Sequence, residues 1–213
     1  MKIIDYDAFM NKKKIADIAY RVCTNASFSV HYQDVYEHLF GSEDSILKLL
    51  FDDNKEISGF GVFENYTLEL EDDFITMLYL SGMVIDRRYQ KMNISKKILR
   101  TTYEEFCSDL ISLRTQNIAM ANSLLHLYSD NLFTSLENLD FTSLEVLKMF
   151  EPFCNMNLNG VIENCYYTQL YPNLDAIRDN FGVELKKKDA LAVVIEPKFF
   201  KRKQLSVFEK KIL

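Results

Sequence analysis

The sequence predicts an α/β (α+β) fold built on one mixed sheet with helices on both faces. Two features of the chain carry this prediction. Three strand patterns joined by short polar turns occupy the first half, and the order then changes to strand, helix, strand, helix. Strands joined by short turns form an antiparallel meander, whereas neighbouring strands joined through a helix pair in parallel.

Size and composition favour a single domain over residues 1–213. The chain is 48% hydrophobic and 13% aromatic, enough to bury a sizeable core, and its six glycines and three prolines leave little material for long linkers. Its formal net charge of -6 is the wrong sign for binding a nucleic-acid backbone, which requires a basic face. We therefore expect one domain without a nucleic-acid partner.

The four cysteines and three histidines do not predict a metal site, because their spacing matches no ligand pattern. No apolar run reaches the length that spans a membrane, and the first residues do not resemble a signal peptide. We expect a cytoplasmic protein with reduced thiols, without a metal and without a membrane partner.

The first half of the chain contains two predicted helices before its strands. Apolar residues at helical spacing predict a helix over residues 12–23, and a second one runs from Tyr32 to Phe40 and ends at Gly41. Turn-forming residues separate the strands that follow. These predicted strands cover residues 45–51, 57–68 and 74–85.

The second half begins with an amphipathic helix over residues 94–106. A short strand at 110–114 and a polar loop at 115–117 lead into another helix. The extended C-terminal segment 129–190 precedes a last apolar strand at 190–195, which we expect to join the sheet.

The junction between the strand at 74–85 and the helix at 94–106 is the strongest candidate for a ligand site. The first N–H groups of a helix have no partner within it and carry the positive end of its dipole, so anions bind there. Lys91, Lys96 and Lys97 add positive charge. Gly82 in the preceding strand indicates a bulge or a close backbone approach. The alternative is an ordinary crossover without a ligand.

The sequence from Ile85 to Ser95 resembles the coenzyme A signature of the GNAT acyltransferase superfamily. In that signature a strand-ending aliphatic residue and four further residues precede Arg/Gln-x-x-Gly-x-Gly/Ala. Gln90 matches its first position, whereas Asn93 and Ser95 stand in place of the glycines. Asparagine tolerates a left-handed backbone and serine is small and caps helices, so both are mild departures.

The run from Arg114 to Asn117 resembles a second loop of some GNAT members, with Ile118 in place of the usual proline. Asn117 is also a good helix N-cap, and capping alone is the alternative explanation for it.

The resemblance implies acetyl-CoA as cosubstrate and an amine acceptor as the second partner. It implies that backbone at the end of the strand pairs with the pantetheine arm and the thioester, and that N–H groups of the following loop bind the pyrophosphate. The implied cofactor-binding residues are Met83, Val84, Ile85, Gln90, Lys91, Met92, Asn93, Ile94, Ser95 and Asn117.

The groups that would transfer protons are harder to assign. GNAT members with a glutamate base carry it where this chain has Tyr79, and a tyrosine with a pKa of about 10 is a poor base. Glu64 is the candidate base working through water, with simple surface exposure as the alternative. The family's tyrosine acid falls at Leu124, so Tyr128 is the candidate acid, with a packing role as the alternative.

The expected function is N-acyl transfer from acetyl-CoA to a primary amine of a small molecule or peptide. Holding an amine beside a thioester supplies much of the rate, so the missing acid and base do not exclude catalysis. The alternative is a GNAT-like coenzyme A-binding sensor or scaffold that has lost the chemistry. Segment 129–190 would build an acceptor pocket or an oligomer contact, and a homodimer is a reasonable expectation.

Overall fold

The computed structural model describes residues 1–6, 10–26, 28, 30–42, 44–69, 74–128, 155–156, 161–163 and 173–195. The chain divides into two compact units, which are described separately. The first comprises residues 1–66 and 79–106, and the second comprises residues 67–78 and the described part of 107–213.

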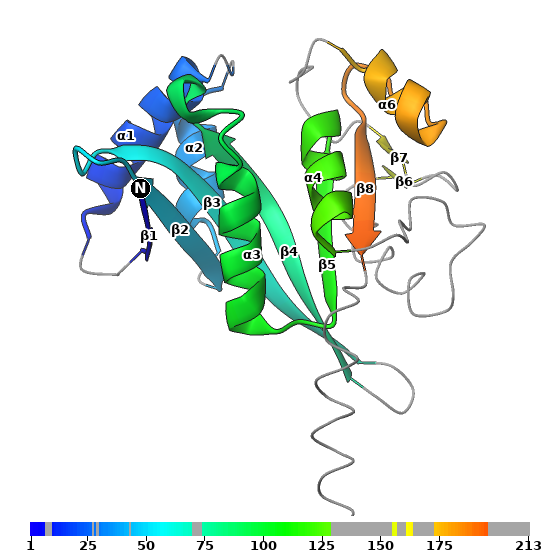
Figure 1. Ribbon diagram of the computed structural model, residues 1–213, viewed down its shortest axis with the longest axis horizontal. Helices are drawn as coiled ribbons and strands as arrows, with labels where there is room; N and C mark the ends of the chain where they lie inside the picture. Colours follow the sequence, from blue (N-terminus) through cyan, green and yellow to red (C-terminus); the bar gives the residue numbers. More distant parts are fainter. Residues whose placement is uncertain are drawn as a thin grey trace, which may run out of the picture. The chain divides into compact units, whose positions relative to one another are not determined.

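The described residues form eight strands in the order β1-β2-β3-β4-β5-β8-β7-β6 (Figure 1). Strand β1 pairs antiparallel with β2, and β2 pairs antiparallel with β3, while β5 and β7 both pair antiparallel with β8. Neighbours β4 and β5 are joined through a helix, which is the arrangement of a parallel pair. The predicted mixed α/β fold is therefore confirmed. The strands are β1 (Lys2–Asp5), β2 (Ser45–Phe51), β3 (Ile57–Glu69), β4 (Phe74–Ile85), β5 (Leu110–Thr115), β6 (Asn155–Met156), β7 (Val161–Glu163) and β8 (Ala190–Ile195).

In the first unit, helices cover both faces of the sheet (Figure 1). These helices are α1 (Lys12–Asn25), α2 (Tyr32–Phe40) and α3 (Ile94–Phe106), with the 3-10 helix η1 at Arg87–Tyr89. Leu47 and Leu49 on β2 lie in one hydrophobic cluster with the apolar residues of α1 and α2. The residue between them points to α3, as the alternation of a strand requires.

That residue is Lys48, whose side chain is only 2% exposed. Its Nζ lies 2.5 Å from a carboxylate oxygen of Asp5 on β1 and 2.5 Å from one of Glu105 on α3. Burial by itself lowers the pKa of Lys48, but the hydrogen bonds to these two carboxylates raise it above its ordinary value. The ion pairs therefore connect β1, β2 and α3 through one buried charge.

The second unit is built around β8, whose six residues are all buried. It contains helices α4 (Ile118–Tyr128) and α6 (Asp175–Phe181), and α6 ends at Gly182 with a φ of 68°. The buried Gln116 amide donates to the carbonyls of Lys187 and Asp189 at 3.0 and 2.7 Å. This contact ties the loop between β5 and α4 to the chain that leads into β8.

The helices and strands that the sequence predicts within the described residues agree with the structure to within two residues at each end. Strand β1 and the short strands β6 and β7 were not predicted, because two to four residues are too few to show a periodic pattern. None of the described helices is long and apolar enough to cross a membrane. The expectation of a single domain stays a prediction.

Candidate functional site

The candidate anion site lies where the loop after β4 enters α3. The Asn93 carbonyl accepts the first helical hydrogen bond, from the Lys97 N–H at 3.1 Å. Within the described part of the chain, the N–H groups of Ile94, Ser95 and Lys96 have no hydrogen-bond acceptor. These donors lie at the positive end of the helix dipole, so they are available to an anionic ligand.

The backbone of this loop is left-handed at two positions. Lys91 has a φ of 64° and Asn93 a φ of 58°. This region is open to glycine and, among residues with a Cβ, most accessible to asparagine and aspartate. Asn93 stands where the signature that the sequence resembles has its first glycine, and its backbone takes a conformation that glycine favours.

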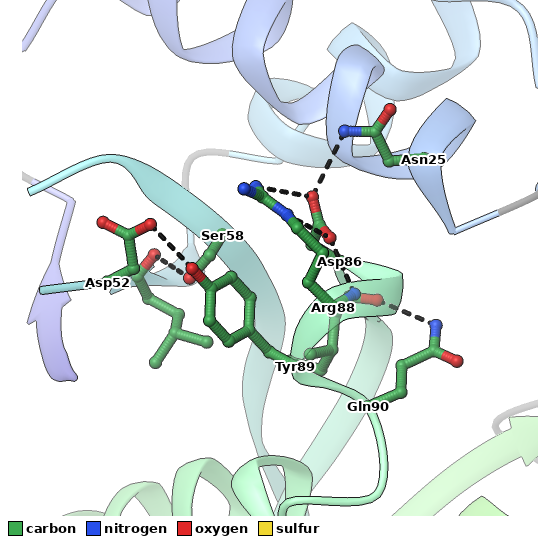
Figure 2. A network of polar contacts seen from close by, with 9 residues as sticks. Asn25, Asp52, Ser58, Asp86, Arg88, Tyr89 and Gln90 are labelled. Carbon is green, nitrogen blue, oxygen red and sulfur yellow. Dashed lines mark hydrogen bonds and ion pairs between the residues drawn. The ribbon is translucent and has the colours of Figure 1, made fainter. Parts of the chain in front are cut away.

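Asp86 anchors the start of the loop (Figure 2). Asp86 is 1% exposed. Its carboxylate accepts hydrogen bonds from the Arg88 backbone N–H at 2.9 Å, from Arg88 Nε and Nη2 at 3.1 Å each, and from Asn25 Nδ2 at 3.2 Å. The Asp86 N–H donates to the Ser58 carbonyl at 2.9 Å. The side-chain hydrogen bonds from Arg88, with further ones from the Arg88 backbone and Asn25, hold the Asp86 pKa below its ordinary value despite burial.

Asp52, in the turn after β2, anchors the other end of η1. Tyr89 Oη donates to Asp52 Oδ2 at 2.9 Å (Figure 2). The other Asp52 oxygen accepts from the backbone N–H groups of Asn54 and Glu56 at 2.9 Å each. The backbone hydrogen bond from Glu56 and then the Tyr89 hydroxyl lower the Asp52 pKa. Gln90 Nε2 also donates to the Ile85 carbonyl at 3.0 Å, which braces the loop internally.

Sequence reasoning missed these two anchors. Asp86 directly follows a buried strand and Asp52 opens a polar turn, but both positions also suit ordinary turn residues. Only the folded chain brings Asp52 within hydrogen-bonding distance of Tyr89, which is 37 residues away in sequence.

Most of the predicted cofactor-binding residues lie together in the first unit. Residues 83–85 are half-buried at the end of β4, and residues 90–93 are exposed. The Ile94 side chain is 8% exposed and belongs to the core, so this residue offers a ligand only its backbone N–H. The Gln90 side chain is engaged within the loop.

Asn117 lies in the second unit and caps α4. Its side-chain Oδ1 accepts from the Ala119 N–H at 2.9 Å, and its carbonyl accepts from Met120 and Ala121 at 3.0 and 3.1 Å. The capping role that was the alternative explanation for this residue is present. A further role in cofactor binding stays a prediction.

The candidate base has a partner of its own. Glu64 is half-buried and accepts a hydrogen bond from the Tyr66 hydroxyl. The Tyr66 ring packs against that of Tyr79, with the ring centroids 6.3 Å apart. Tyr128, the candidate acid, is the last residue of α4, and its side chain lies outside the described residues.

The group that lies closest to Gly82 is a side chain, the imidazole of His38. A Cβ placed on Gly82 would lie 2.1 Å from Nε2 of His38, so the imidazole occupies the space that any side chain would need. Val84, two residues further along the strand, packs against the hydrophobic cluster that includes α1 and α2.

In comparisons with known proteins, no family model and no curated protein matches this chain. Among solved structures, it is similar to the ribosomal-protein alanine N-acetyltransferase of Escherichia coli, with 12% identity, coverage of 92% of this chain and 93% of that one, and a TM-score of 0.46.

Two further similarities cover less of the chain. A GNAT family acetyltransferase of Staphylococcus aureus is 16% identical over 55% of this chain and 89% of that one, with a TM-score of 0.42. An aminoglycoside 6'-N-acetyltransferase of Acinetobacter baumannii is 10% identical over 59% and 86%, with a TM-score of 0.41. Similarities at this level carry no conclusion about activity, so the function proposed below rests on the residues of this chain.

Proposed function

We propose that this chain is an acyl-CoA-dependent N-acyltransferase that transfers acetyl from acetyl-CoA directly to a primary amine of a small molecule or peptide. The observation that carries the proposal is the loop before α3. Its Asn93 takes a left-handed backbone at the position of a signature glycine, and the N–H groups that follow have no acceptor among the described residues.

The pyrophosphate of coenzyme A is the ligand that suits this loop. It would accept from the N–H groups of Ile94, Ser95 and Lys96, and the ammonium groups of Lys91, Lys96 and Lys97 would offset its negative charge. The Asp86 and Asp52 anchors hold the loop before the ligand arrives, which reduces the entropy lost on binding. Backbone at Met83, Val84 and Ile85 would pair with the pantetheine arm.

Acyl transfer to an amine requires a deprotonated nucleophile beside a polarised thioester carbonyl. Backbone donors at the end of β4 can orient and polarise the carbonyl whatever side chains the strand carries. The net negative charge of the chain favours a cationic acceptor, such as a protonated amine. A cytoplasmic location and a homodimer stay predictions.

Calorimetric titration with acetyl-CoA, and separately with free coenzyme A, tests the proposal. We expect the unmodified protein to bind with a micromolar dissociation constant. In the Ser95→Glu variant this constant should be at least tenfold larger, because the new carboxylate would lie among the N–H groups proposed to bind the pyrophosphate. Thr101→Glu is the matched control, since it places the same charge at an exposed position further along α3. Absence of binding to the unmodified protein would overturn the proposal.

Binding and transfer are then separated by an acetylation assay on a panel of primary amines. Tyr79 stands at the family's base position, and Glu64 is engaged by Tyr66, and these two observations favour a module that binds coenzyme A without catalysis as the second candidate. Binding of acetyl-CoA with no acetylation of any amine would support that second function.

A further inference from the structure

His38, in the last turn of α2, lies against the backbone of β4. A Cβ built on Gly82 would be 2.1 Å from His38 Nε2, 3.0 Å from its Cδ2 and 3.2 Å from its Cε1. The nitrogen is therefore the imidazole atom nearest to the strand. The absence of a side chain at Gly82 is what admits the ring, because a real Cβ essentially never lies as close as 2.1 Å to another heavy atom.

The place of contact coincides with a change in burial along β4. Residues 77–80 of the strand are buried, whereas residues 81–85 are half-buried, and His38 itself is exposed. Residues 83–85 are those whose backbone we propose pairs with the thioester and the pantetheine arm. The imidazole thus lies one residue before that segment, at the point where the strand becomes accessible.

Other groups near this face are poorly suited to accept a proton from an amine. Tyr79 is 9% exposed and packs on Tyr66, and the Tyr66 hydroxyl is bonded to the Glu64 carboxylate. Histidine is the side chain that most often serves as a general base, since an imidazole nitrogen can accept a proton from an ammonium group. His38 supplies the kind of base that the family's glutamate position lacks in this chain.

We infer that His38 is the general base of the proposed acyl transfer, an inference that rests on the proposed function. Nε2 of His38 takes one proton from the substrate ammonium group. The lone pair of the resulting amine forms the C–N bond to the thioester carbonyl carbon, and the C–S bond breaks with its electron pair leaving on sulfur. The second N–H proton passes to the thiolate, and the imidazolium returns its proton to solvent, so the products are the amide and free coenzyme A.

The test compares His38→Ala with His31→Ala in steady-state acetylation. His31 is exposed at the N-cap of α2 and makes no side-chain capping bond, so it is a matched control on the same helix. We expect His38→Ala to lower kcat about 100-fold, because general-base catalysis contributes on this order. The KM for acetyl-CoA and its calorimetric Kd should not change. Added imidazole should restore part of the lost kcat, which a purely structural role of His38 would not allow.

A second variant, on β4, tests the same imidazole. Gly82→Ala would displace the imidazole, so it should lower kcat. The double variant His38→Ala/Gly82→Ala should have the same kcat as His38→Ala, because the effects of residues that act as a unit are not additive. Circular dichroism establishes that each variant is folded.

Several outcomes would overturn the inference. Normal kcat in His38→Ala would do so while leaving the proposed acyltransferase intact. Loss of kcat with weakened acetyl-CoA binding and no effect of imidazole would assign His38 a structural role. Failure of the unmodified protein to bind acetyl-CoA would remove the proposed function itself and the inference with it.

Discussion

At the scale of single residues, the left-handed backbone of Asn93 has a cost that depends on which side chain stands there. Its φ of 58° is strained for most residues with a Cβ, costing about 1–2 kcal/mol, and less for asparagine. We expect Asn93→Ala to lower the free energy of unfolding by about 1 kcal/mol and to weaken acetyl-CoA binding, whereas Asn93→Gly should preserve both. Urea denaturation and calorimetry measure the two effects.

Lys13→Ala is the control for this comparison, because Lys13 is exposed on α1, outside the loop, and is not among the positive-φ residues. Equal destabilisation by alanine and glycine at position 93 would show that the side-chain amide, and not the backbone conformation, stabilises the loop.

Asp86 is the second residue whose replacement should lower the free energy of unfolding by a predictable amount. Asp86→Ala would leave the Asn25 amide and the Arg88 guanidinium without their shared acceptor, but Arg88 is 60% exposed and stays hydrated. We expect a loss of about 2 kcal/mol in the free energy of unfolding, from the buried hydrogen bonds. Asp53→Ala, with a side chain 92% exposed, should change it by less than about 0.5 kcal/mol. A loss no larger than that of the control would contradict the anchoring role of Asp86.

The sequence indicates the residue types of this site but not their partners. Gln90 and Asn93 are recognisable from a motif, because their spacing along the chain is the signal. The Asp52 contact with Tyr89 and the approach of His38 to Gly82 join residues 37 and 44 positions apart, so no local pattern contains them. These contacts depend on how β2, β4 and α2 pack.

At the scale of elements, β4 and α3 were predictable with their bounds because each has a strong pattern that ends at a clear break. Strand β1 has four residues and depends on neighbours for its stability, which the sequence does not display. One of those neighbours is β2, where Lys48 forms an ion pair with Asp5 of β1. A lysine inside an apolar strand pattern was a local conflict that only this pairing explains.

Lys48 therefore tests how the elements of the first unit are held together. Lys48→Met retains an unbranched apolar stem beside the Phe106 ring and leaves Asp5 and Glu105, which are 60% and 46% exposed, in contact with water. We expect it to change the free energy of unfolding by less than about 1 kcal/mol. Lys48→Glu would bury a charge beside two carboxylates and should cost more than about 3 kcal/mol. Similar urea midpoints for the two variants would contradict this account.

At the scale of the whole molecule, the free energy of unfolding should fall at low pH, because the pKa of Asp86 is lowered in the folded protein. The folded pKa lies below the ordinary value of 3.8, so near and below that value the unfolded chain binds more protons than the folded one. The contribution of Asp86 is fully present above the ordinary pKa and is lost as pH falls through the folded pKa. The Asp52 carboxylate acts in the same direction.

Asp86→Asn isolates this contribution, because its amide cannot titrate and cannot accept the same set of hydrogen bonds. Urea unfolding from neutral pH down to about pH 3 should show a stability gap between the unmodified protein and Asp86→Asn that is constant near neutrality and narrows below about pH 4. The narrowing follows because acid protonates the native carboxylate and removes the charge that Arg88 stabilises. A gap that stays constant to the lowest pH would mean that Asp86 contributes through shape alone, and the ionic anchor of the loop before α3 would then have to be sought at Asp52.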